Sequence, residues 1–142
     1  MVSADLDVVR RAYTLYNAGE VERATRECFH DEVVLVRRPL GQPEAYEGHD
    51  GLRRAHAEAL GEFANYRMEP ERFFALDDRV VVAVRVSGTD PKTGIEARTA
   101  ASHVVELRDG CIARWEVFLE LDEALAAADW DPERGEVHWA TG

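Results

Sequence analysis

Two long runs of alternating residues, joined by Arg108-Asp109-Gly110, constrain the fold of this chain more than any other stretch. A side-chain period of two predicts a half-buried strand, and Asp-Gly accepts the positive φ angles of a tight antiparallel connection. We therefore predict a β-hairpin over residues 95–119. Its inward face would carry Ala97, Thr99, Ala101, His103, Val105 and Leu107 from the first strand and Cys111, Ala113, Trp115, Val117 and Leu119 from the second. One histidine, His103, thus falls in a mostly apolar row.

The remaining periodicities predict an α+β fold. Apolar residues at helical spacing predict helices over 5–18, 20–29 and 49–64, and a short C-terminal helix over 122–128. Runs rich in β-branched and aromatic residues predict strands over 33–36, 66–75 and 79–88, with an edge or a bulge at Pro70. Residues 40–48 have the composition of a loop. This order predicts three helices from the first half of the chain on one face of a curved antiparallel sheet.

Composition limits the classes of function. A chain of 142 residues is one domain with a proper core. Its formal charge of −11 argues against nucleic acid, whose phosphates need a surplus of Lys and Arg, and against anionic membranes. The first residues lack the pattern of a signal peptide and no apolar run approaches a membrane span, so we expect a cytoplasmic location. Cys28 and Cys111 are expected to be reduced, buried thiols.

Several short segments follow one another with a distinctive order and spacing. They are Val8-Val9-Arg10-Arg11-Ala12-Tyr13, Asn17-Ala18-Gly19-Glu20, Phe29-His30-Asp31-Glu32-Val33, Tyr46-Glu47-Gly48, Arg108-Asp109-Gly110-Cys111-Ile112-Ala113-Arg114-Trp115 and Asp122-Glu123-Ala124-Leu125. Together they resemble the SnoaL-like group of the nuclear-transport-factor-2-like superfamily, to about Ala128. The resemblance implies a cone-shaped domain over residues 1–128 around an apolar pocket, and a homodimer formed through the outer sheet face. Residues 129–142 form a loosely patterned acidic tail.

The resemblance does not carry a known reaction with it. The ketosteroid isomerase pattern puts an oxyanion-hole tyrosine at Ala12, a general-base aspartate near Arg37 and a second oxyanion donor near His103. The epoxide hydrolase pattern puts its Arg and two Asp residues near Val84, Val86 and Val117. Neither set of groups is present, and one fold hosts many functions.

Three polar residues are candidates for chemistry. A buried neutral His103 suits general acid/base work, Tyr16 supplies a phenol donor, and Arg37 a cation for a carboxylate or enolate oxygen. The structural alternatives are a hydrogen-bonded core histidine, an aromatic residue that only packs, and a solvated arginine. The expected pocket wall consists of Ala12, Tyr13, Leu35, His56, Val84, Val86, Ala101, Trp115 and Val117.

The leading hypothesis is a SnoaL-like pocket protein that binds a small, mostly apolar molecule. One alternative is a cofactor-independent isomerase, cyclase or hydrolase, in which His103 is the general acid/base and Tyr16 or Arg37 stabilises an enolate-like oxygen. A second alternative is a non-catalytic structural dimer whose interior is filled by side chains. We expect no metal and no cofactor, because the five histidines form no HxH or HExxH pair and no glycine-rich phosphate loop occurs.

Overall fold

The computed structural model describes residues 2–38 and 42–140. In that part of the chain, four helices and seven strands follow in the order α1 (Val2–Asn17), α2 (Val21–Cys28), β1 (Phe29–Arg37), β2 (Glu44–Glu47), α3 (Gly48–Glu62), β3 (Ala64–Leu76), β4 (Arg79–Thr89), β5 (Glu96–Arg108), β6 (Cys111–Phe118), α4 (Leu121–Ala127) and β7 (Glu136–Trp139). Gly19 ends α1 with a φ of +80°, the left-handed conformation that commonly follows a helix. No helix of the described ranges is long and apolar enough to cross a bilayer.

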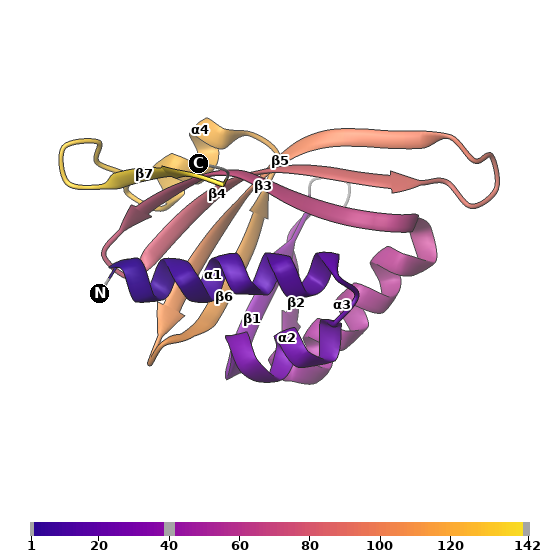
Figure 1. The fold of residues 1–142 in the computed structure, drawn as a ribbon, viewed down its shortest axis with the longest axis horizontal. Helices are drawn as coiled ribbons and strands as arrows, with labels where there is room; N and C mark the ends of the chain where they lie inside the picture. The colour runs from indigo at the N-terminus through magenta and orange to yellow at the C-terminus, as the bar shows by residue number, and fades with distance from the viewer. Residues whose placement is uncertain (1, 39–41, 141–142) are drawn as a thin grey trace.

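The strands form one sheet in the order β2-β1-β6-β5-β4-β3-β7. Helices α1, α2 and α3 lie on one side of this curved sheet, and α4 lies on the other (Figure 1). The predicted α+β class is therefore confirmed. The sheet is mixed, however, because β1 pairs with β6 in parallel. The predicted loop over 40–48 is partly wrong: residues 39–41 lie outside the described residues, but Glu44–Glu47 pairs with β1 as a strand.

The central hairpin is confirmed, with a bulge that changes which side chains face inward. An unbroken ladder would pair Leu107 with Ala113, but Leu107 pairs with Ile112 instead. The extra residue reverses the alternation at the start of β6. Ile112 is consequently fully buried, whereas Cys111 is a half-buried free thiol. The expected inward positions of Cys111 and Ala113 are therefore wrong, while Trp115 keeps its inward position.

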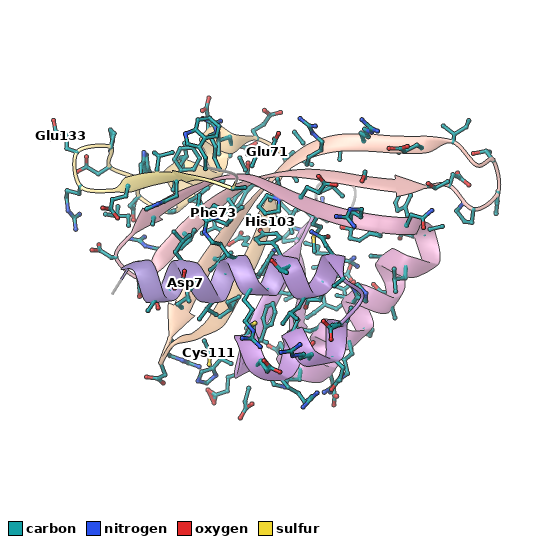
Figure 2. All side chains as sticks on the ribbon, in the orientation of Figure 1. Asp7, Glu71, Phe73, His103, Cys111 and Glu133 are labelled. Carbon is teal, nitrogen blue, oxygen red and sulfur yellow. The ribbon has the colours of Figure 1, made fainter. Side chains whose placement is uncertain are left out.

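A second bulge lies in β3, where Pro70 predicted an edge or an irregularity. Pro70 pairs with Val84, and the register shifts before Arg72 pairs. The shift reverses the alternation, so Met68 before the bulge and Phe73 after it both lie on the helix side, while Phe74 packs on the outer side. The prediction at Pro70 is thus confirmed. Figure 2 shows Phe73 and His103 between α1 and the sheet.

Two apolar clusters hold the layers together. The main core lies between α1, α2, α3 and the inner sheet face, and a smaller outer cluster lies under α4. Residues 129–140 of the tail add to both the sheet and the outer cluster. Its strand β7 pairs with β3 over residues 72–75, and the Trp130 ring packs edge-on against Phe74 with centroids 5.4 Å apart. The acidic composition of the tail did not predict this strand.

Candidate functional site

A cavity of about 330 Å³ lies between α1, α3 and the inner face of the sheet. Most of its wall is apolar or aromatic: Tyr16, Phe29, Leu35, Leu52, Ala55, His56, Ala59, Met68, Val86, Ala101, Trp115, Val117 and Leu119. Its polar contributors are Arg37, Arg38, Glu62, Tyr66, Thr99 and His103. The fold thus encloses an apolar space with few polar groups, and these come from different elements.

The structure brings most of the expected wall residues to this cavity, but not all. Leu35, His56, Val86, Ala101, Trp115 and Val117 line it, as do the three candidates for chemistry. Ala12, Tyr13 and Val84 do not. They are at most 1% exposed and belong to the packed core beside the cavity. Tyr13 is held there by rings, since its centroid lies 5.1 Å from that of Trp115 and 6.4 Å from that of Phe73.

Aromatic rings form one continuous part of the wall. Trp115, on the inner face of β6, has its centroid 5.8 Å from Phe29 and 5.0 Å from His103. Tyr16 of α1 stacks on His56 of α3 with centroids 5.6 Å apart. Such surfaces favour flat, ring-bearing molecules, because tilted and stacked contacts between rings add to the burial of apolar area.

His103 lies at the inner end of the cavity and is only 2% exposed. Its Nδ1 lies 2.7 Å from the hydroxyl of Tyr13, which reaches across from α1 to β5. Burial lowers the pKa of His103 to about 3, because an apolar environment disfavours the imidazolium. The ring is therefore neutral throughout the physiological range.

The hydrogen bond with Tyr13 fixes the tautomer of His103. Among the described residues, the Tyr13 hydroxyl makes no other hydrogen bond. If Nδ1 carried the hydrogen, that buried hydroxyl would have no acceptor, at a cost of about 1–3 kcal/mol. We therefore assign the Tyr13 O–H as donor, Nδ1 as acceptor and Nε2 as the protonated nitrogen. His103 lines the cavity and Tyr13 does not, so Nε2–H is the group on the cavity side.

This geometry favours a different role for His103 from the one that the sequence indicated. A general base needs a pKa near the working pH. A neutral imidazole whose pKa is about 3 is a poor proton acceptor at pH 7. The same ring is a well-oriented hydrogen-bond donor through Nε2–H.

Arg37 lies at the outer end of the cavity, in a cluster with two residues from other elements. Its Nη2 lies 2.8 Å from Oε2 of Glu58 on α3 and 2.5 Å from the hydroxyl of Tyr46 on β2. Burial raises the pKa of Tyr46 to about 12, helped by its hydrogen bond to Glu58. The hydrogen bond from Tyr46, with the charge of Arg37, holds the pKa of Glu58 below its usual value. The guanidinium charge is thus already paired.

Tyr16 lies with a third set of partners. Its ring contacts those of Phe29 and His56, and burial raises the pKa of its phenol to about 12. The three candidates for chemistry therefore line one cavity, but His103 bonds to Tyr13 and Arg37 to Glu58, while the Tyr16 ring packs against those of Phe29 and His56. Within the described ranges, no three His, Cys, Asp or Glu side chains gather in a way that suits a metal ion.

The sequence carried a signal for some wall residues that were missed. Leu52, Ala55 and Ala59 follow from the helical spacing that places His56 on the wall, and Met68 follows from the alternation of β3. The cluster of Arg37, Tyr46 and Glu58 had no such signal. It joins β1, β2 and α3, and no pattern within one element indicates a contact between three elements.

A curved sheet with three helices on its inner face, beside a mostly apolar cavity, defines a cone-shaped α+β fold. The family model that describes the SnoaL-like domain matches residues 9–115 of the chain. The chain therefore belongs to the SnoaL-like family. No curated protein matches it.

Solved structures agree on the fold. A proposed SnoaL-like polyketide cyclase from Jannaschia sp. CCS1 is 18% identical, with 92% of this chain and 94% of that chain covered and a TM-score of 0.74. TerC, co-crystallized with polyporic acid, is 22% identical over 89% of this chain and 97% of that one, with a TM-score of 0.72. Bal32a, from a soil-derived mobile gene cassette, is 19% identical over 85% and 93%, also with a TM-score of 0.72. At these identities the likeness shows the fold alone.

Proposed function

We propose that this SnoaL-like protein binds a small, mostly apolar molecule in the cavity between its helices and its sheet. The observation that carries the proposal is the cavity itself, about 330 Å³ with a mostly apolar and aromatic wall. Ligand sites in proteins typically have about 300–1,000 Å³ and a few polar groups that orient the ligand. The co-crystallized small molecule of TerC supports the same use of the fold.

A second candidate function is a cofactor-independent enzyme of the isomerase or cyclase type. The observation that favours it is the hydrogen bond between Tyr13 and Nδ1 of the buried His103, which assigns an Nε2–H to the cavity side, where a fixed donor stabilises developing negative charge on oxygen. In this role His103 polarises a carbonyl group rather than removing a proton. Arg37 is less suited than the sequence indicated, because its charge is paired with Glu58, and Tyr16 is less suited because burial raises the pKa of its phenol to about 12.

The third hypothesis, a structural dimer with a filled interior, has less support, because the described side chains leave the cavity open. A homodimer remains part of the proposal. Helix α4 and Trp130 already cover the outer face over Phe74, Val81 and Val104. A dimer through that face would therefore use the exposed first half of β5 beside Ile95, which is 67% exposed. A cytoplasmic location also remains a prediction.

A thermal-shift screen tests the proposal. The purified protein is heated with panels of steroids, terpenes, polyketide-type aromatics and small aldehydes. A ligand at about a hundred times its Kd adds about 2.7 kcal/mol to the free energy of unfolding, which is several degrees for a domain of this size. Each hit is incubated with the protein and then analysed by mass spectrometry. An unchanged hit supports the binding protein, and an altered one supports the enzyme. If no compound moves the midpoint, the proposal is wrong.

A further inference from the structure

We infer that the ligand of this cavity presents a neutral carbonyl oxygen to His103, which donates its Nε2–H to that oxygen. The inference rests on the proposed function, a small molecule in the cavity, and names its chemical class. The candidates are ring-bearing ketones, quinones, aldehydes and esters.

The donor at the inner end is set by the protein before any ligand binds. The Tyr13 hydroxyl donates a hydrogen bond of 2.7 Å to Nδ1, so Nε2–H is the polar group of the ring that remains free for a ligand. The side chains around it on the cavity wall are apolar: Trp115 lies with its centroid 5.0 Å away, Val117 is the cross-strand partner, and Ala101 is the next residue on the same face of β5. A ligand that covers this N–H without an acceptor leaves a buried donor unpaired, which selects against pure hydrocarbons.

The charges of the cavity favour a neutral acceptor over a carboxylate. A neutral imidazole supplies no positive charge at the inner end, and an unpaired anion in an apolar interior is strongly disfavoured. The charges of both wall arginines are in ion pairs, although Nε of Arg37 and Nη1 of Arg38 make no hydrogen bond within the described residues. The side chain of Arg37 is 26% exposed and bonded to Glu58, and that of Arg38 is 31% exposed and bonded to Glu116. A cationic ligand is disfavoured too, because His103 presents an N–H donor, whose hydrogen carries partial positive charge, to the ligand.

Two compounds of matched shape test the inference. The ketone 1-tetralone and the hydrocarbon tetralin are titrated into the protein. One hydrogen bond predicts that 1-tetralone binds about three- to tenfold more tightly. The infrared carbonyl stretch of bound 1-tetralone should also lie below its frequency in a hydrocarbon solvent. In the Tyr13→Phe/His103→Phe double variant, which removes the donor without leaving the Tyr13 hydroxyl unpaired, the preference for 1-tetralone over tetralin and the shift of the carbonyl stretch should both disappear.

The outcomes separate this inference from the proposed function. If both compounds bind the wild type equally and the carbonyl stretch does not move, the inference is wrong and the apolar-cavity proposal stands. If neither compound binds and the thermal-shift panels are also silent, the proposed function falls and the inference with it. If the double variant does not fold, the carbonyl stretch in the wild type decides, because it needs no variant.

Discussion

The hydroxyl of Tyr13 lies 2.7 Å from Nδ1 of His103, and their ring planes differ by only 3°. This hydrogen bond ties α1 to β5 through the main core. It also sets which ring nitrogen faces the cavity, so one contact joins the stability of the fold to the chemistry of the site.

Acid should weaken the fold through His103. Burial lowers its pKa to about 3 from an ordinary value of 6.5, so the ring is neutral when folded and protonated when unfolded below pH 6.5. The free energy of unfolding therefore falls as the pH drops from 6.5 towards 3. Between pH 7.5 and pH 5 the expected loss from this residue is about 2 kcal/mol. Urea denaturation at both pH values measures it.

The control for this pH dependence is the Tyr13→Phe/His103→Phe double variant. It keeps His56, whose pKa burial also lowers, so the difference between the two proteins isolates His103. The variant should lose about 2 kcal/mol less than the wild type over the same pH interval. An equal loss in both proteins would contradict a neutral, buried His103.

Tyr13→Phe should both destabilise the protein and release the tautomer of His103. The variant leaves Nδ1 without its partner, which lowers the free energy of unfolding by about 1–3 kcal/mol. Nitrogen-15 NMR of the His103 ring should show protonated Nε2 in the wild type and a mixture of tautomers in Tyr13→Phe. The control Tyr16→Phe should leave the spectrum of His103 unchanged. A wild-type ring protonated on Nδ1 would refute the assigned donor.

Two glycines of α3 should respond to alanine in opposite directions. A Cβ at Gly51 would lie 2.8 Å from the backbone carbonyl carbon of Tyr46, so α3 would have to move away from β2. Gly51→Ala should therefore destabilise by about 1–3 kcal/mol. At Gly61 nothing lies within 4 Å of the new Cβ, and Gly61→Ala should stabilise by up to about 1 kcal/mol. Urea denaturation of both variants checks the packing of α3, and the same sign in both would contradict it.

The tail should stabilise the domain through Trp130. The ring of Trp130 packs on Phe74 and also covers Gly135, so Trp130→Ala should lower the free energy of unfolding by about 2 kcal/mol. Trp139 is 63% exposed, and Trp139→Ala should change that free energy by less than about 1 kcal/mol. Thermal denaturation of the two variants compares them. If Trp130→Ala matches the wild type, the tail does not hold the outer face.

Sequence patterns predicted most of the fold, because each pattern depends only on the residues of a single helix, strand or turn. Alternation around Arg108-Asp109-Gly110 predicted the hairpin, and Pro70 predicted the bulge in β3. The bulge at the start of β6 was not predicted. Each residue of Cys111-Ile112-Ala113 suits burial, so the sequence does not indicate which of them is the extra residue of the bulge. Strand β7 escaped as well, since its edge position allows polar residues on both faces.

The candidate site was less accessible to prediction than the fold. Alternation placed His103 on the inner face, but which tyrosine it meets depends on how α1 turns against β5. Tyr13 and Tyr16 both lie on the apolar face of α1, and the structure brings the Tyr13 hydroxyl to His103 and the Tyr16 ring to Phe29 and His56. The pairing of Arg37 with Glu58 likewise depends on the approach of α3 to β1.

If the cavity is a ligand site, a side chain that fills it should abolish binding. Ala101 lines the cavity, whereas the neighbouring Ala100 is exposed on the opposite face of β5. We would titrate 1-tetralone into the wild type, Ala101→Leu and the matched control Ala100→Leu. We expect a loss of affinity of at least about tenfold in Ala101→Leu, because overpacking excludes the ligand, and none in Ala100→Leu. Wild-type affinity in Ala101→Leu would contradict the claim.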